Sequence, residues 1–128
     1  MLPLCASEGI GVIPWSPLAR GRLTRDWDET TRRTETDEFG KTLYTSAVES
    51  DRKVVESVAE VAAKRGVSRA QVALAWLLSK PVITAPIVGA SKPQHLDDAF
   101  AALSLKLSEE EISRLEEHYV PHPIVGFS

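Results

Sequence analysis

The amino-acid sequence predicts an α/β protein with parallel strands that is part of a larger α/β unit. Residues 10–15 and 84–88 are short, apolar and rich in β-branched side chains, a pattern typical of strands buried on both faces. Each run leads into a turn and then a helical pattern, so we expect parallel pairing through helical crossovers. Two strands alone would leave unpaired backbone groups at their edges. We therefore expect further chain to complete the sheet.

The first third of the chain combines a helix end, the first strand and a polar stretch. Leu2 to Glu8 has the pattern of the last turns of a helix closed by Gly9, and its abrupt beginning indicates a missing upstream segment. Residues 22–46 carry charges of both signs and few apolar anchors. A stretch of that length is unusual for an idle loop.

Two helices are predicted between the strands. Apolar residues spaced by three and four predict a helix from about Ala47 to Arg65, which Gly66 ends. Ser68 is a suitable N-cap for the next helix, at 69–80, which is apolar around most of its circumference. Pro81 terminates that helix.

Two more helices are predicted after the second strand. A glycine turn at 89–92 opens into a helix with Pro93 near its first position. Ser108 and Glu111 have the spacing of a capping box for a last helix that reaches about Tyr119.

Composition excludes several functional classes. The chain has 128 residues, 43% of them hydrophobic, which suits about one folded domain. A net charge of -3 gives no chain-wide field to attract nucleic acid or an anionic membrane, and no apolar run is long enough to span a bilayer. The single cysteine, Cys5, excludes an internal disulfide framework and favours a reducing cytoplasm. His118 and His122 have no partners at metal-ligand spacing, so we predict no metal site.

Three segments resemble the C-terminal part of the aldo-keto reductase family. GVIPWSPLARGRL resembles the seventh strand and its loop, SRAQVALAWLL the seventh helix, and APIVGASKPQHLDDAF the eighth strand with its helix. The ending PHPIVGF is similar to the tail of some bacterial members. The resemblance implies that residues 1–128 form the C-terminal portion of a TIM (β/α)8 barrel: its last two parallel strands with their helices.

The turn after the first strand is one candidate cofactor site. In TIM barrels the loops after strands seven and eight commonly build a phosphate site. Gly21 permits close backbone approach, and Ser16 offers a hydroxyl beside backbone N–H groups. The alternative is an ordinary strand-ending turn with a solvated arginine pair. The resemblance implies that the residues contacting the nicotinamide cofactor are Ser16, Pro17, Leu18, Gly21 and Leu23.

The turn before the third predicted helix is the second candidate. At Ser91 and Lys92 backbone N–H groups, the positive end of the helix dipole and an ammonium converge, which suits a phosphate. The resemblance implies that this turn, with Gly89, binds the 2′-phosphate of NADP(H), and that Asp98 accepts a hydrogen bond from the adenine amine. The alternative for Lys92 is a solvated surface lysine.

Two positions near this turn depart from the family pattern. His95 stands at a cofactor-binding position where the family commonly has Gln or Arg, and Ala99 stands where it commonly has Asn. Each missing hydrogen bond would weaken adenine binding by about 1–2 kcal/mol.

The remaining candidates have simpler explanations. Tyr44 and Tyr119 lie in nothing that resembles a catalytic motif. Trp15 and Trp76 are predicted as core or barrel-wall aromatics, with a place beside the nicotinamide as the alternative for Trp15. Gln71 is predicted as an exposed residue in the first turns of its helix. The run at 26–40 is either a solvated loop or, following strand seven, a lid over the cofactor cleft.

The resemblance implies hydride transfer from a nicotinamide to an aldehyde or ketone. The tyrosine, lysine, aspartate and histidine that catalyse it come from the first half of the barrel, so we assign no catalytic residue here. We expect the chain alone to be inactive and to bind NADPH weakly or not at all. One alternative is a noncatalytic nucleotide-binding or interaction module that pairs its open edges with another chain or with itself. Another is a structural remnant without activity. An in-frame Asp…Tyr…Lys…His series upstream would favour the reductase.

Overall fold

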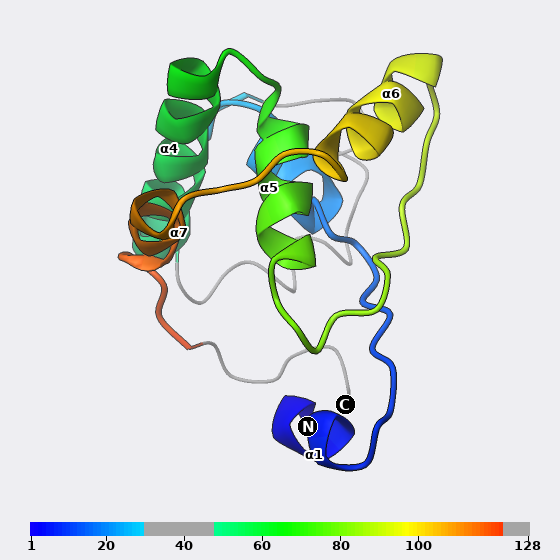
Figure 1. The fold of residues 1–128 in the computed structure, drawn as a ribbon. Helices are drawn as coiled ribbons and strands as arrows, with labels where there is room; N and C mark the ends of the chain where they lie inside the picture. The colour runs from blue at the N-terminus through cyan, green and yellow to red at the C-terminus, as the bar shows by residue number, and fades with distance from the viewer. Residues whose placement is uncertain (30–47, 122–128) are drawn as a thin grey trace, which may run out of the picture.

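Helices form most of the secondary structure in residues 1–29 and 48–121, the part of the chain that the computed structural model describes. Figure 1 shows α5 between α4 and α7 on one side and α6 on the other. The elements are α1 (Leu2–Ser7), the 3-10 helix η1 (Ala19–Thr24), α4 (Val48–Arg65), α5 (Arg69–Leu78), α6 (Pro93–Ala102) and α7 (Glu109–Glu116).

Capping residues define the helix ends, as the sequence predicts. The Ser68 hydroxyl accepts a hydrogen bond from the Gln71 N–H at the start of α5. Ser108 and Glu111 form the complete capping box of α7. α6 begins at Pro93.

Two helix ends were predicted too far along the chain. α5 stops at Leu78 rather than at residue 80, because the residue before Pro81 is disfavoured in the helical conformation. α7 stops at Glu116 rather than near Tyr119. There the Tyr119 N–H bonds to the Glu116 carbonyl at 3.0 Å, a tighter turn that ends the regular helix.

The core lies where α4, α5 and α7 meet. Val72 of α5 is fully buried, and Leu115 of α7 is 6% exposed. Full burial of one such side chain stabilises the fold by about 1.5–3 kcal/mol. The buried cluster consists of Val58, Val61, Ala62, Val72 and Leu115, with Leu23, Val67, Trp76, Leu105 and Leu107 packed against it.

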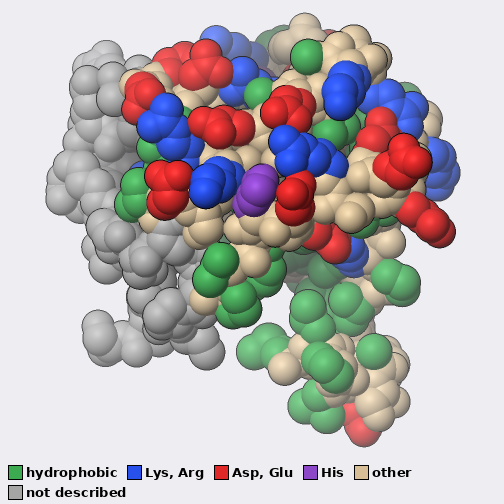
Figure 2. Space-filling model, turned by 90° about the vertical axis from the view of Figure 1, so that its left-hand side faces the viewer, with side chains coloured by type: hydrophobic (Ala, Val, Ile, Leu, Met, Phe, Trp, Pro, Cys, Tyr) green, Lys and Arg blue, Asp and Glu red, His purple; other side chains and the backbone are tan. Residues whose placement is uncertain are grey.

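Charged side chains of both signs cover the outer face of α4 and α7 (Figure 2). Arg114 of α7 donates to Glu60 of α4 at 2.9 Å. Two residues after α5, the Lys80 ammonium pairs with the Glu116 carboxylate of α7. These pairs join the three helices around the core.

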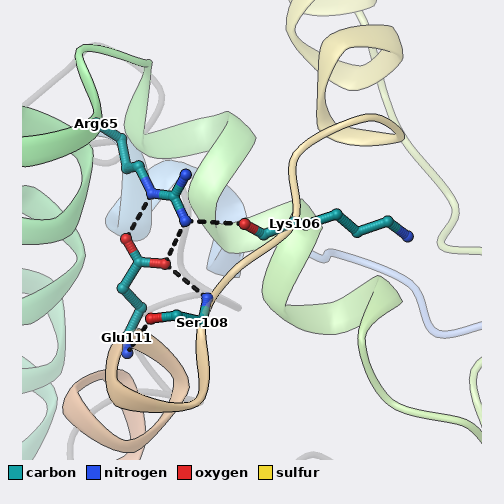
Figure 3. Close-up of polar contacts among 4 residues, drawn as sticks. All are labelled: Arg65, Lys106, Ser108 and Glu111. Atoms are coloured by element: carbon teal, nitrogen blue, oxygen red, sulfur yellow. Dashed lines mark hydrogen bonds and ion pairs between the residues drawn. The ribbon is translucent and has the colours of Figure 1, made fainter.

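Arg65 at the end of α4 makes the most extensive of these contacts (Figure 3). Its Nε and Nη2 donate to the two carboxylate oxygens of Glu111 at 2.5 and 2.7 Å, and Nη2 also donates to the Lys106 carbonyl at 2.9 Å. The Ser108 N–H donates to the same carboxylate at 2.7 Å. The hydrogen bonds from Arg65 and then Ser108 lower the pKa of Glu111 from 4.5 to about 2.

The two predicted strands run parallel, as expected, but they are joined only by isolated bridges. Val12 pairs with Ile83 and Trp15 with Ile87. The Thr84 N–H donates to the Val12 carbonyl at 2.9 Å. Gly11 permits this approach, since a Cβ there would lie 2.8 Å from the Thr84 hydroxyl oxygen.

The prediction that these strands are buried on both faces is wrong. Ile10, Ile13 and Ile87 are 54–62% exposed, and Trp15, predicted as a core or wall aromatic, is 59% exposed. No third strand pairs with them among residues 1–29 and 48–121. A partial TIM barrel therefore stays a prediction.

Candidate functional site

The two candidate turns follow the bridged segments at the same end. In a parallel pair the carboxyl ends of both segments point the same way. Ser16 comes directly after the bridge between Trp15 and Ile87, and Gly89 and Ser91 follow it by two and four residues. In Figure 1 the first segment runs upward from α1, and the second runs upward from the loop after α5 to α6.

The first turn has an unusual backbone. Ser16, Ala19 and Arg20 have φ of 54°, 48° and 57°, and Gly21 has φ of 91°. Positive φ costs a residue with a Cβ about 1–2 kcal/mol, and such strain clusters at ligand-binding segments. Hydrogen bonds from the Ala19 N–H to the Ser16 carbonyl and from the Gly21 N–H to the Leu18 carbonyl, each 2.9 Å, hold the turn. Sequence analysis singled out Gly21 for close backbone approach only, and no residue type signals the positive φ of Ser16, Ala19 and Arg20.

The helices anchor this turn from one side. Leu23 packs against the core cluster, and the Thr24 hydroxyl donates to the Gly21 carbonyl at 2.9 Å. The Arg69 guanidinium at the start of α5 bonds to Asp26 at 2.5 Å. Leu23 therefore holds the turn against the helices. Its contact with a cofactor stays a prediction. The predicted residues Ser16, Pro17, Leu18 and Gly21 are half-buried.

The second turn is open to solvent at the start of α6. Gly89, Ser91, Lys92 and His95 are exposed, and a Cβ at Gly89 would meet no atom within 4 Å. Lys92 is the N-cap, and no side chain caps the helix there. The Ser91 N–H donates to His95 Nδ1 at 3.4 Å, which leaves Nε2 of a neutral ring as a donor. The Lys92 ammonium, the His95 imidazole N–H and the positive end of α6 are each groups that attract an anion.

Asp98 lies behind this turn, on α6. Its Oδ1 accepts hydrogen bonds from the Ser68 hydroxyl at 2.9 Å and from Gln71 Nε2 at 2.8 Å. The prediction that Gln71 is exposed is wrong, because this contact holds it half-buried between α5 and α6. Ser68 and Gln71 have the S-x-x-Q spacing of a capping box. Sequence analysis did not foresee that the amide reaches across to α6.

Other predicted residues lie away from the turns or outside the described residues. Trp76 Nε1 donates to Glu116 at 2.9 Å and supports the core, and Tyr119 is 64% exposed. The His118 Nε2 atom lies 3.9 Å from the carboxylate oxygen Oε2 of its neighbour Glu117. Outside the described residues lie Tyr44, His122 and most of the proposed lid at 26–40.

The described residues contain neither a metal-binding cluster nor a membrane-spanning helix. No group of three or more His, Cys, Asp or Glu side chains could hold a metal ion within residues 1–29 and 48–121. Over the same residues, no helix combines the length and apolar character needed to cross a membrane.

A family model for the aldo/keto reductases matches residues 1–120. The chain belongs to the aldo/keto reductase family. The resemblance predicted from the turn sequences is thereby confirmed. The family assignment covers both candidate turns and all the helices described above.

Individual relatives agree with this assignment. The chain is 44% identical over 126 residues to the versiconal hemiacetal acetate reductase of Aspergillus parasiticus, which covers 97% of this chain and 36% of that protein. It is 41% identical over 130 residues to an aldo-keto reductase of Fusarium vanettenii, covering 100% of this chain and 34% of that protein. A thermostable aldo-keto reductase crystallised with the inhibitor epalrestat superposes with a TM-score of 0.60 at 27% identity, over 92% of this chain and 33% of that one. The chain thus spans about a third of the length of these relatives.

Proposed function

We propose that the chain is the cofactor-binding C-terminal part of an NADPH-dependent aldo-keto reductase that acts on aldehydes or ketones in the cytoplasm. The observation that carries the proposal is the parallel pairing of the two segments, which supports placing both turns at one end of the pair. In this proposal residues 1–128 form the last third of a TIM barrel.

The residues present fit a dinucleotide phosphate. Lys92 supplies a positive charge at the N-cap of α6, and the His95 ring, in the first turn of the same helix, supplies an N–H. We assign these two residues, with Ser91 and Gly89, to the 2′-phosphate. The strained turn from Ser16 to Gly21 offers the Ser16 hydroxyl and the Leu18 N–H to the pyrophosphate, since the Ala19 and Gly21 N–H groups bond within the turn. Bound NADPH would supply the hydride.

Asp98 fits the adenine end in a specific way. Because Ser68 and Gln71 both donate to Oδ1, the carboxylate is fixed in orientation and Oδ2 is left to accept from an amine. The carboxylate therefore needs little reordering to bind adenine. The name of one relative, a versiconal hemiacetal acetate reductase, supports this substrate class. The groups that donate the proton to the carbonyl oxygen would lie in the rest of the barrel.

A chimeric enzyme tests this function. The segment of the Aspergillus parasiticus reductase that matches this chain is replaced by residues 1–128, and NADPH and NADH affinities are measured by fluorescence titration. We expect the chimera to bind NADPH and to reduce versiconal hemiacetal acetate. Lys92→Ala should weaken NADPH binding about tenfold, or about 1.4 kcal/mol, and leave NADH binding unchanged.

Lys106→Ala is the matched control. Lys106 is exposed, and the contact described for it runs through its backbone carbonyl. We expect this variant to bind both cofactors as the unsubstituted chimera does. Equal losses of NADPH and NADH affinity in Lys92→Ala, or no loss of either, would contradict the proposed phosphate site.

A further inference from the structure

The Gln71 side chain does not cap its own helix. In the capping box of α7, the Glu111 carboxylate accepts a hydrogen bond from the Ser108 N–H at 2.7 Å. Ser68 and Gln71 have the same spacing at the start of α5. There, however, the Gln71 amide donates to Asp98 of α6 at 2.8 Å. The Gln71 side chain therefore acts on α6 rather than on the helix that carries it.

Asp98 is held through one of its two carboxylate oxygens. The hydrogen bonds from the Ser68 hydroxyl and from Gln71 Nε2 both end on Oδ1. The side chain is half-buried, and Oδ2 accepts no hydrogen bond from residues 1–29 and 48–121. Rotation of a carboxylate about its bond to Cβ is otherwise loosely restricted. Two donors that converge on Oδ1 from different positions restrict this rotation and fix the direction of Oδ2.

The two donors stand on a rigid part of α5. Val72, the residue after Gln71, is fully buried, and Ala73 is 5% exposed. The Gln71 N–H also donates to the Ser68 hydroxyl, at 3.2 Å. The start of α5 is therefore fixed both by the core and by its own cap. Binding groups whose orientation is set by hydrogen bonds from such rigid elements are preorganised for a ligand.

A carboxylate oxygen with a fixed direction distinguishes donors from acceptors on a base. An ionised carboxylate accepts hydrogen bonds and donates none. Oδ2 of Asp98 therefore suits the 6-amino group of adenine, whereas hypoxanthine would present an acceptor oxygen to it. A site that hydrogen-bonds one group rejects an analogue without that group much more strongly than shape alone does. This rejection weakens when the carboxylate can turn away.

We propose that Gln71 is a positioning residue that makes the site selective for adenine, acting through Asp98 by directing Oδ2 at the amine of the base. The inference rests on the proposed function, which assigns Asp98 to the adenine end. Ser68 also donates to Asp98, but it caps α5, so its substitution would change the stability of the helix as well. Substitution of Gln71 leaves the cap in place, because the cap uses the backbone N–H of Gln71. Gln71 is therefore the residue that tests the positioning role.

Two cofactors that differ in the purine base test the role of Gln71. The chimera with the Aspergillus parasiticus reductase is titrated by fluorescence with NADPH and with reduced nicotinamide hypoxanthine dinucleotide phosphate. We expect it to bind NADPH about tenfold more tightly than the hypoxanthine cofactor. Gln71→Ala and Gln71→Glu should each lower this ratio of affinities about fivefold, because neither side chain donates to Asp98 at about pH 8.

A double substitution shows whether Gln71 acts through Asp98. Asp98→Ala should abolish the preference for NADPH, and adding Gln71→Ala to it should change the ratio no further. Gln94→Ala is the matched control, because Gln94 is an exposed glutamine in the first turn of α6, and it should leave the ratio unchanged. Lys92→Ala should weaken binding of both cofactors equally, since both carry the 2′-phosphate.

Failure of this inference can be distinguished from failure of the proposed function. If the chimera binds NADPH but does not prefer it, or if the Gln71 substitutions leave the ratio unchanged, only the inference fails. Effects of Gln71→Ala and Asp98→Ala that add in the double variant would also overturn it. If the chimera binds neither cofactor, the proposed function fails and the inference with it. Circular dichroism should show equal helix content in all variants, and should Gln71→Ala lose helix, Gln71→Glu, which keeps the size of the side chain, decides the outcome.

Discussion

Replacing Glu111 by Gln should destabilise the helical part of the fold in a pH-dependent way. The substitution removes the negative charge that receives two hydrogen bonds from Arg65 and one from the Ser108 N–H (Figure 3). It also weakens the capping box of α7. The link between the end of α4 and the start of α7 is therefore the interaction that this variant measures.

The size of the effect follows from the lowered pKa. The fall of the Glu111 pKa from 4.5 to about 2 corresponds to at most about 3.4 kcal/mol, at 1.36 kcal/mol for each pKa unit. Because the Glu111 and Arg65 side chains are 20% and 37% exposed, solvent screening reduces this to about 1–2 kcal/mol. Since the folded-state pKa is the lower one, the stabilisation is complete above about pH 4.5 and is lost as the pH falls toward 2.

Urea unfolding followed by circular dichroism measures this difference. At pH 7 Glu111→Gln should lower the free energy of unfolding by about 1–2 kcal/mol, and at pH 3 by less than half as much. Glu110→Gln, one residue earlier in α7, should change it by less than about 0.5 kcal/mol at either pH. An equal loss at both pH values, or an equal loss in the two variants, would refute the role assigned to the Arg65 contact.

Four further substitutions test the packing, a helix cap and a turn, each by urea unfolding. Leu115→Ala should lower the free energy of unfolding by about 2–4 kcal/mol, because this side chain is only 6% exposed. Leu103→Ala, at a 60% exposed position, should lower it by less than about 0.5 kcal/mol. Similar losses in the two variants would disprove the core assignment. Ser68→Ala should cost about 1–2 kcal/mol through loss of the α5 N-cap, and an unchanged stability would exclude that cap. Gly21→Ala should cost about 1 kcal/mol because φ is 91°, and a stabilised variant would show that the turn adopts another backbone conformation.

The helices could be predicted because their signals are local. Ser68, Pro93, Ser108 and Glu111 act within one helical turn of their own positions. A short-range hydrogen bond needs no knowledge of the rest of the fold. Parallel pairing was also predicted correctly, from the crossover pattern between the two apolar runs.

Burial of the strands could not be predicted from this sequence. An apolar β-branched run indicates that a strand has partners on both faces, but it does not say whether the same chain contains them. Ile13 and Trp15 were therefore predicted to be buried, but the structure shows them exposed.

Long-range polar contacts and positive φ angles could not be predicted from the sequence either. The Gln71 amide reaches Asp98 across 27 residues of chain, and no spacing rule predicts that pair. Ser16 and Ala19 adopt positive φ without being glycine, a choice set by the whole turn.

The most direct test of the central claim is an amide chemical-shift titration of the chain with NADP+. If the two turns at one end of the parallel pair hold one dinucleotide, the shifts of residues 16–21 and 89–95 should change together and fit one dissociation constant, on the order of 1 mM for the chain alone. Shifts confined to one turn or to the charged face of α4 and α7, or two unrelated dissociation constants, would contradict the claim.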